Sequence, residues 1–556
     1  MAANRHLPDG GGVGSDGPEL ALVLVVREPT PSALRRCLHS VAAQTSARWS
    51  LSVACIGPLE PEAGEALDEA LAQLPSGRVD VLWCGEDASE PEAAAAALAA
   101  TSAPTFMLLG QHDRLAADAV GLLATALVDA DVAYGDDDDV DDTGSPRDPH
   151  LKPDWSPELC LSFPYVGHPV AYRREPAVAG GGIRALEDGD WEHDLLLRTT
   201  ERLPSSRVAH LSEVLCHRQV DGATDSPGAT TNPPGDAAVA SALARRGIAA
   251  SVASGPVEGS WTLKRRVRGR PKVTTVIPFR DAAPLLRACV DSVTETTAGD
   301  GVELELVLVD NGSTEPETFT LLDRLEARPG VLVRRDSRPF NWAALNNAAV
   351  DAGRGDVLLF LNNDVEALRP GWLAALAAQA LRADVGAVGA RLLFPGGRVQ
   401  HAGVVLGLGG AAGHVLAGLP GDQPGYLGMA VLTRDCSAVT GACLATRRDI
   451  FESLGGFDED LGLDVNDIDY CLRARELGLA AIYEPRAELV HHESPSRGTS
   501  GSPKDQLRFL ERWQGMVEAG DPYLNRQLTR ADCSAALRRT DEDKEWQEWR
   551  STLTTS

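Results

Sequence analysis

Apolar residues along the chain follow two spacings, which alternate most regularly between residues 273 and 361. Residues 283–297 and 341–352 carry apolar side chains every three or four positions, as amphipathic helices do. Continuous apolar runs, typical of strands covered on both faces, occupy 273–278, 304–310, 330–335 and 356–361. Strands that alternate with helices predict an α/β fold with a mainly parallel central sheet.

The same pattern occurs twice in the chain. The segment LRRCLHSVAAQT at 34–45 aligns with LRACVDSVTETT at 286–297, which lies 252 residues later. Each segment follows an apolar run, and WEHDLLLR at 191–198 resembles NDIDYCLR at 466–473. Internal similarity of this kind predicts two tandem domains of one α/β class.

Composition sets the expected limits of these domains. The polar, Gly-rich residues 1–19 predict a disordered tail, followed by a first domain over 20–260. Residues 261–272 include the basic stretch LKRRVRGRPK, which predicts a solvated linker, with an anionic lipid patch as the alternative. The second domain is expected over 273–515, and a helical extension over 516–556.

The charge balance restricts the ligands. Eighty Asp and Glu residues against 52 Lys and Arg residues give a net charge of −28, which repels nucleic acid and requires local cations wherever phosphate binds. Ten cysteines without a C-x-x-C pair indicate buried reduced thiols. The apolar run at 20–26 is too short to span a membrane and lacks a cationic leader. We therefore expect a cytoplasmic protein, with peripheral contact at the inner face of the plasma membrane left open.

Polar side chains follow three of the strands predicted in the second domain. Asp281 comes after the first strand, Asp310 ends the second, and LFLNND ends the fourth with Asn362, Asn363 and Asp364. Ligands of open parallel sheets bind at the carboxyl ends of the strands, so these side chains are expected to share one rim. A divalent cation prefers oxygen ligands, which suits Asp364, although this carboxylate could equally cap the next helix.

A second group of polar residues lies further along. A helix is predicted to begin near Asp467, and Asp469 points about 200° away around that helix, so the two carboxylates cannot act as a pair. A strand then leads to His491 and His492, which are predicted to lie in a loop. Imidazole is a suitable ligand for Mn²⁺ or a similar ion, whereas a single His is more often structural.

Six motifs occur in a fixed order: VIPFRD, VLVDNGST, LFLNND, TGACLATRRDIFESLGGFDEDL, NDIDYCLR and ELVHHESPSRG. This set resembles the inverting family 2 glycosyltransferases of GT-A fold, and among them the rhamnosyltransferase-like, tandem-domain enzymes of bacterial cell-surface polysaccharide synthesis. The resemblance covers 273–530 strongly. The first domain also resembles the family, including KPDWSPELCLS at 152–162. Two tandem GT-A-like domains are therefore implied.

The resemblance implies roles for particular residues. Asp467 would be the catalytic base, and Asp364 with His491 would bind Mg²⁺ or Mn²⁺. Asn362 departs from the family's D-x-D metal motif, which has aspartate at that position. Five residues would line the nucleotide-sugar pocket: Pro278, Asp281, Asp310, Asn362 and Asn363. Three would lie on the acceptor side: Asn466, Asp469 and His401.

The implied reaction moves a sugar from a nucleotide-diphosphate donor to a saccharide or polyprenyl-linked acceptor. Asp467, ionised at neutral pH, would take the proton of the attacking hydroxyl, and the anomeric configuration would invert. A cation at Asp364 would offset the charge on the departing diphosphate. The alternative, from a different class, is a non-catalytic carbohydrate-binding or scaffolding partner of another transferase.

The first domain lacks these groups. Gly110 and His112 stand at the matching positions of the metal motif, and Glu192 at the position of the base. We interpret this domain as catalytically inactive and retained for packing or acceptor binding, although Asp113 and His217 leave the question open.

Three further segments receive no catalytic role. The run GDDDDVDD at 135–142 lacks the spacing of a calcium loop and predicts a solvated acidic loop. GLGGAA at 407–412 leads into helix-breaking residues, which predicts a flexible acceptor-side loop carrying His401 and His414. DEDKEWQEWR at 541–550 predicts a surface helix.

Overall fold

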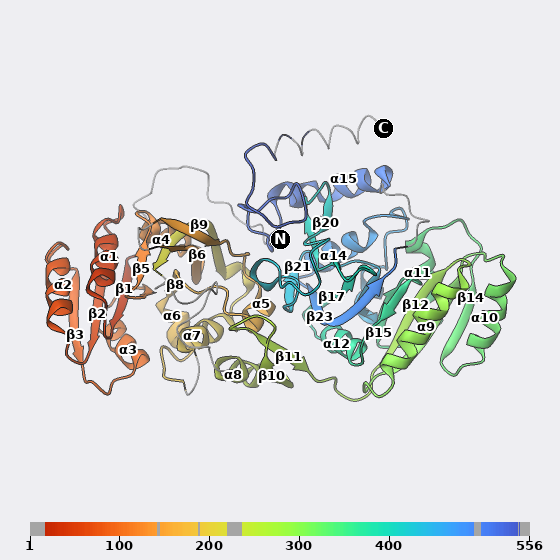
Figure 1. Ribbon diagram of the computed structural model, residues 1–556, viewed down its shortest axis with the longest axis horizontal. Coiled ribbons are helices and arrows are strands. Elements are labelled where there is room, and N and C mark those ends of the chain that lie inside the picture. Colours follow the sequence, from red (N-terminus) through yellow and green to blue (C-terminus); the bar gives the residue numbers. More distant parts are fainter. Residues whose placement is uncertain are drawn as a thin grey trace. The chain divides into compact units, whose positions relative to one another are not determined.

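The computed structural model describes residues 17–141, 145–186, 190–219, 236–493, 502–542, 544 and 547 (Figure 1). Most of the expected tail at 1–19 and most of the segment 541–550 lie outside these residues. The chain divides into two compact units. The first unit comprises Met1–Trp155 and Phe163–Trp261, and the second comprises Ser156–Ser162 and Thr262–Ser556.

The first unit is built on a sheet of strand order β3-β2-β1-β4-β8-β6-β9-β5, with β7 beside β6. Its strands are β1 (Leu20–Val26), β2 (Trp49–Ile56), β3 (Val79–Cys84), β4 (Thr105–Leu109), β5 (Asp113–Leu115), β6 (Val132–Val140), β7 (Pro146–His150), β8 (Val170–Arg173) and β9 (Val208–Gln219). Its helices are α1 (Pro31–Ala42), α2 (Pro61–Leu71), α3 (Glu90–Ala100), α4 (Ala119–Ala126), α6 (Arg174–Ala179), α7 (Trp191–Thr200) and α8 (Ala237–Arg245).

The second unit repeats this topology, with the order β14-β13-β12-β15-β22-β17-β23-β16. Its strands in that sheet are β12 (Lys272–Phe279), β13 (Glu303–Asp310), β14 (Val331–Arg335), β15 (Val357–Leu361), β16 (Val365–Ala367), β17 (Val385–Leu393), β22 (Cys443–Arg447) and β23 (Ala480–His491), with β18 (Val399–His401) and β21 (Arg434–Cys436) at its side. Its helices are α5 (Pro157–Ser162), α9 (Ala283–Thr297), α10 (Pro316–Glu326), α11 (Trp342–Val350), α12 (Trp372–Ala380), α13 (Arg448–Ser453), α14 (Asn466–Glu476) and α15 (Pro503–Ala519).

The elements predicted over residues 273–361 are all present, with ends that differ by no more than two residues. β12 pairs in parallel with β13 and β15, so the α/β fold with tandem units is confirmed. β22 then joins β15 antiparallel, so the rest of the sheet is mixed. The core explains the spacing, because Leu286, Cys289, Val290 and Val293 of α9 are fully buried against these strands.

The prediction of a solvated loop for the acidic run at 135–142 was wrong for residues 135–140, which lie in strand β6. Strand β6 contains four of its aspartates, and each is between 0% and 9% exposed. A basic side chain of the first unit meets every one of them: Asp136–His210 at 2.9 Å, Asp137–Lys152 at 2.7 Å, Asp138–His217 at 2.5 Å and Asp139–Arg218 at 3.3 Å. Carboxylates that are paired in this way can be buried, whereas unpaired ones cannot.

The predicted solvated linker at 261–272 was wrong in its first part. β11 (Trp261–Arg265) is a strand of a two-stranded sheet. Arg265 is only 8% exposed, and its Nη2 lies 2.9 Å from Glu158 on α5. A guanidinium buried against a carboxylate is not available to an anionic lipid.

The helical extension expected over 516–556 is interrupted, and the residues described beyond 541, which are 542, 544 and 547, are helical again. α15 stops at Ala519, and residues 520–541 form turns, bends and an isolated bridge between Leu528 and Leu537. In the part of the chain that the structure describes, no helix has the length and apolar content needed to cross a bilayer.

Candidate active site

Two strand ends of the second unit are braced by their own loops. Asp310, the last residue of β13, is 2% exposed and accepts a hydrogen bond from Ser313 N at 2.7 Å. Arg335 Nε lies 3.5 Å from its other carboxylate oxygen. Asp281, just beyond β12, accepts from Thr314 N at 2.8 Å, while its own N donates to Ser313 Oγ at 2.7 Å. Asp281 and Asp310 are therefore held together at the ends of β12 and β13 through residues 313 and 314.

The loop after β15 meets the end of β23. Val365, the first residue of β16, is paired with His491, the last residue of β23, and this register brings the preceding Asp364 beside the imidazole. Asp364 Oδ1 lies 3.1 Å from His491 Nε2, and the two side chains are 7% and 11% exposed. His491 was expected in a loop, but its place at the end of a strand fixes the ring more firmly.

Gln400 orients the His491 ring. His491 Nδ1 lies 2.7 Å from Gln400 Oε1. Because an amide oxygen only accepts, Nδ1 donates to Gln400, and this bond fixes the ring so that Nε2 faces Asp364. Asn362 lies on the same side, with its Nδ2 3.4 Å from His491 Nε2 and its Oδ1 accepting from Trp342 Nε1 at 3.3 Å. Neither Gln400 nor Trp342 was predicted, since no motif in the sequence marks them.

The pair formed by Asp364 and His491 fits a divalent ion that binds together with a diphosphate. One carboxylate and one imidazole nitrogen suit Mn²⁺ or a similar ion. No group of three His, Cys, Asp or Glu side chains that could hold a metal occurs among the described residues. Two protein ligands suffice where substrate phosphates complete the coordination shell. Of the other residues expected here, Asn363 is partly exposed beside Asp364, whereas Pro278 is buried within β12.

Asp467 lies in the first turn of α14. Its Oδ2 accepts from Gly441 N at 2.6 Å and its Oδ1 from Ile468 N at 2.8 Å. Burial raises the pKa of Asp467, and the nearby Asp464 carboxylate raises this pKa further. A Cβ at residue 441 would lie 2.8 Å from the Trp342 ring, so only glycine brings this N–H to the carboxylate. The Trp342 ring therefore lies beside Gly441, which binds Asp467, while its Nε1 donates to Asn362.

Two of the residues expected on the acceptor side are inside the second unit. Asn466 is 5% exposed and donates to Leu461 O at 3.0 Å. His401 is fully buried against His414, with ring centroids 4.8 Å apart, and burial lowers its pKa well below the usual value. Residues 407–411 are the turn of a hairpin between β19 (Val404–Leu406) and β20 (Ala412–His414). The side chains of Asn466 and His401 are therefore too buried for an acceptor to reach them.

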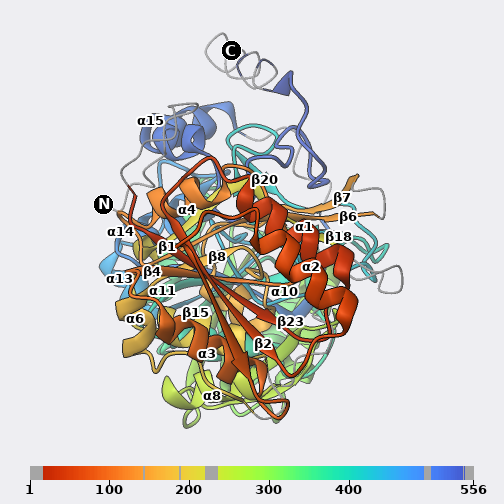
Figure 2. The ribbon, with the colours of Figure 1, turned by 90° about the vertical axis from the view of Figure 1, so that its left-hand side faces the viewer.

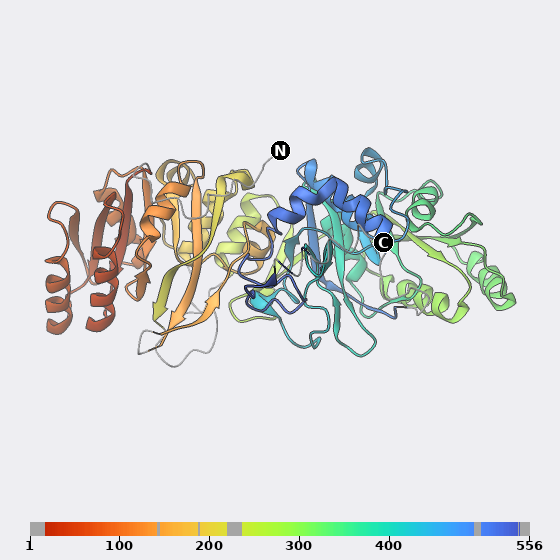
Figure 3. The same cartoon turned by 90° about the horizontal axis from the view of Figure 1, so that it is seen from above.

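Asp469, the third acceptor-side candidate, is a structural ion-pair centre instead. It is fully buried, 2.7 Å from Arg473 Nε and 3.1 Å from Arg512 Nη1, and it accepts from Trp513 Nε1 at 2.9 Å. These contacts hold α15 on α14, and Figure 3 shows α15 in blue lying across the second unit. Asp194 on α7 has the same role in the first unit.

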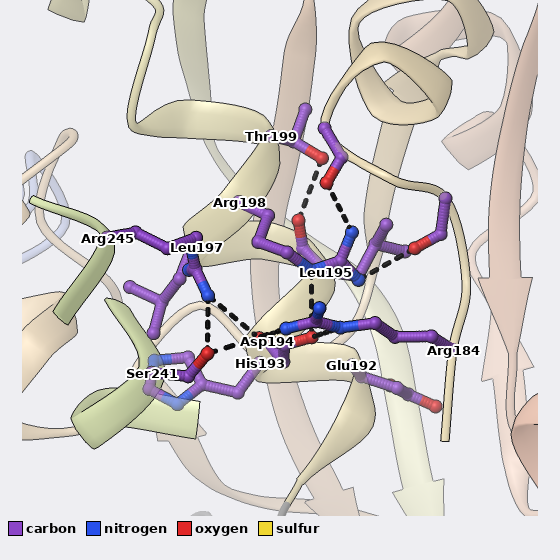
Figure 4. Close-up of polar contacts among 12 residues, drawn as sticks. Arg184, Glu192, His193, Asp194, Leu195, Leu197, Arg198, Thr199, Ser241 and Arg245 are labelled. Carbon is purple, nitrogen blue, oxygen red and sulfur yellow. Dashed lines mark hydrogen bonds and ion pairs between the residues drawn. The ribbon is translucent and has the colours of Figure 1, made fainter. Parts of the chain in front are cut away.

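Figure 4 shows the Asp194 cluster of the first unit. Arg184 Nε and Arg198 Nε lie 2.9 Å and 2.8 Å from Asp194 Oδ2, and the aspartate is fully buried. Glu192, two residues earlier on α7, points away from this cluster (Figure 4). In both α7 and α14, the acid two residues before the buried aspartate, Glu192 or Asp467, therefore has partners outside the buried ion-pair cluster.

The first unit has different groups where the second has its candidate metal ligands and base. Arg218 on β9 pairs with Asp113 of β5, at the register position that His491 has in the second unit. His168 Nδ1 lies 2.5 Å from Asp113 Oδ2, and its Nε2 lies 2.6 Å from Glu192 Oε2. Burial lowers the pKa of His168, but the two carboxylates raise this pKa by more, so that it lies well above its usual value. An imidazolium therefore bridges the two acids.

The chain resembles known proteins over most of its length. It is 38% identical over 538 residues, 95% of the chain, to the O-antigen biosynthesis protein RfbC of Myxococcus xanthus. It is 37% identical over 92% of the chain to the Uncharacterized protein y4gI of Sinorhizobium fredii. The chain spans 42% and 58% of the length of these relatives. A shorter match, 38% identical over 11% of the chain and 20% of the relative, is to an N-acetylglucosaminyl-diphospho-decaprenol L-rhamnosyltransferase of Mycobacterium tuberculosis.

Solved structures give weaker matches. A crystal structure of GalNAc-T7 with UDP, GalNAc and Mn²⁺ has 17% identity and a TM-score of 0.35, covering 45% of this chain and 50% of that one. The mannosyltransferase PcManGT from Pyrobaculum calidifontis has 19% identity and a TM-score of 0.32, covering 49% and 72%.

A family model identifies the second unit more directly. Residues 274–455 match the model described as Glycosyl transferase family 2. This range runs from β12 to the end of α13 and includes Asp310 and Asp364 at the strand ends. Residues 274–455, within the second unit, therefore form a glycosyl transferase family 2 domain.

Proposed function

We propose that the second unit transfers a sugar from a nucleotide-diphosphate donor to a saccharide acceptor, with inversion of the anomeric configuration. One observation supports this most strongly: Asp364 meets His491 at the strand ends, and Asp467 is anchored nearby through Gly441 and Trp342. Residues around a shared rim at the carboxyl ends of strands are typical of nucleotide-binding α/β folds.

Asp364 and His491 would hold Mg²⁺ or Mn²⁺. When bound, such an ion offsets negative charge on a leaving diphosphate. Gln400 would act as a positioning residue, because it fixes which ring nitrogen of His491 faces Asp364. Asn362, Asn363, Asp281 and Asp310 would line the nucleotide-sugar pocket.

Asp467 would be the catalytic base. Its carboxylate would accept the proton of the acceptor hydroxyl while that oxygen bonds to the anomeric carbon, on the face opposite the departing diphosphate. The raised pKa makes the ionised carboxylate a stronger base than an exposed aspartate. The N–H groups of Gly441 and Ile468 hold its two oxygens in one orientation.

The names of the relatives support a place in cell-surface polysaccharide synthesis. One is an O-antigen biosynthesis protein and another is a rhamnosyltransferase whose name describes a decaprenol-diphosphate acceptor. We infer that the acceptor is a saccharide or a polyprenyl-linked saccharide, met at the cytoplasmic face of a membrane through peripheral contact.

A donor screen tests the proposal. The full chain is incubated with nucleotide sugars and Mn²⁺ or Mg²⁺, and nucleoside diphosphate release is measured. Release is expected with at least one donor, and EDTA or Asp364→Ala should abolish it, while His112→Ala at the matching position of the first unit should not. Absence of release with every donor would favour the non-catalytic scaffolding alternative.

A further inference from the structure

A cavity of about 700 Å³ lies in the first unit, away from the residues proposed for catalysis. It is bounded by α1, by α2 and by the neighbouring strands β5 and β9. Figures 1 and 2 show α1 and α2 side by side, and Figure 1 shows α1 close to β5. Its size falls within the range of about 300–1,000 Å³ that is usual for small-molecule sites. Five of its lining residues are basic: Arg35, Arg36, His39, Arg114 and His217.

Two of these basic groups are already neutralised. Arg35 lies 3.1 Å from Glu69, the one acidic residue of the lining, and His217 lies 2.5 Å from Asp138. Arg36 donates to the neutral amide oxygen of Gln219. Arg114 is exposed, and it forms no ion pair with a carboxylate among the described residues. The guanidinium groups of Arg36 and Arg114 therefore leave positive charge in the cavity of a protein whose net charge is −28.

The second unit does not repeat this charge. The offset that aligns α1 with α9 and β5 with β16 places Ala288 at the position of Arg36, Asp291 at that of His39 and Glu366 at that of Arg114. The general architecture of the fold therefore does not require these basic residues. Clefts lined by one sign of charge concentrate counter-ions, so the cavity favours an anion.

We propose that this cavity of the first unit binds a phosphate-bearing ligand, with Arg36 and Arg114 as its main contacts. Guanidinium groups match phosphate oxygens in pairs of hydrogen bonds, and two of them on separate elements can hold one phosphate or diphosphate between them. The ligand is either a soluble phosphate compound or the headgroup of an anionic lipid. The proposal does not depend on the second unit being catalytic.

Calorimetry with inorganic pyrophosphate tests it directly. The full chain is titrated in EDTA, so that binding at a metal-dependent donor site does not contribute. The variant Arg36→Glu/Arg114→Glu is compared with Arg287→Glu, which changes an exposed arginine of α9 in the second unit. Pyrophosphate affinity should fall by about 10- to 100-fold in the double variant and stay unchanged in Arg287→Glu.

Vesicles distinguish the two sources of phosphate. Co-sedimentation with phosphatidylglycerol vesicles that is lost in the double variant, and is absent with phosphatidylcholine, would identify a lipid headgroup; arginine-dependent pyrophosphate binding alone would identify a soluble ligand. The milder variant Arg36→Gln/Arg114→Gln serves if the Glu variant does not fold. No binding of either probe by the wild-type chain, or equal binding by the folded double variant, would overturn the proposal.

Discussion

At the scale of single residues, the environment of Asp467 supports its proposed role as the base. Burial is the main cause of its raised pKa, and Asp464 adds to the rise through repulsion between carboxylates. The backbone N–H groups of Gly441 and Ile468 act in the opposite direction. The pKa of such a base lies nearer to neutral pH than the pKa of an exposed aspartate.

The pH dependence of transfer should report this tuning. A base works only when ionised, so the rate should fall as the pH drops through the pKa of Asp467, which lies above its ordinary value of 3.8. Asp464→Asn removes a neighbouring negative charge and should move this acid limb to lower pH. A pH–rate profile of nucleoside diphosphate release measures both. An acid limb that moves to higher pH in Asp464→Asn would contradict the assignment.

The sequence located the residues to which the proposal assigns catalysis and metal binding, but not the residues that contact and orient them. Asp310, Asp364 and Asp467 stand at strand ends or at a helix start, which spacing alone can locate. Gln400 and Trp342 act through contacts with residues distant in the chain, and such contacts leave no local pattern. For the same reason, Asp469 could not be distinguished from an exposed acid until its partners on α15 were known.

At the scale of elements, the spacing of apolar residues predicted strands and helices correctly, whereas amino-acid composition wrongly predicted a loop. The four strands and two helices predicted over 273–361 follow directly from apolar spacing, whereas α10 in the same range was not predicted. The acidic strand β6 was missed because its composition is that of a solvated loop, while its basic partners come from β9 and from residues near β7. Burial of charge is decided by tertiary pairing, which a local pattern cannot reveal.

The two buried aspartates of α7 and α14 should each stabilise their own unit. Asp469→Asn would leave the Arg473 guanidinium inside the second unit without its carboxylate partner, and is expected to lower the free energy of unfolding by roughly 3–5 kcal/mol. Asp194→Asn should do the same in the first unit. Urea denaturation with peptide-level hydrogen exchange measures which unit is affected. Unchanged stability in either variant would mean that its ion pairs contribute little.

At the scale of the whole molecule, the two units share a topology but differ in what they bury. The second unit has the Asp364–His491 pair, whereas the first has an imidazolium bridge and a strand of paired aspartates. The first unit thus has a dense set of buried histidine–carboxylate contacts, which ties its stability to pH.

The first unit should lose stability in alkaline solution. Although burial lowers it, hydrogen bonds to Asp136 and Asp154 raise the pKa of His210 from 6.5 to about 9. A raised folded-state pKa gives stability that is complete below about pH 6.5 and is lost as the pH rises through 9, about 3 kcal/mol in all. Hydrogen exchange of β6 and β9 between pH 6 and 10, corrected for its intrinsic pH dependence, measures this loss. His210→Gln should flatten this dependence of hydrogen exchange on pH. A flat profile in the wild-type chain would contradict the predicted loss of stability.

The most direct test compares the two acids at matching positions of the two units. Nucleoside diphosphate release by the full chain is measured for Asp467→Asn and for Glu192→Gln, with the donor and metal ion that the wild-type chain uses. We expect Asp467→Asn to lower the rate by about 10²- to 10⁴-fold and Glu192→Gln to leave it within about twofold. Full activity in Asp467→Asn, or its loss in Glu192→Gln alone, would contradict catalysis by the second unit.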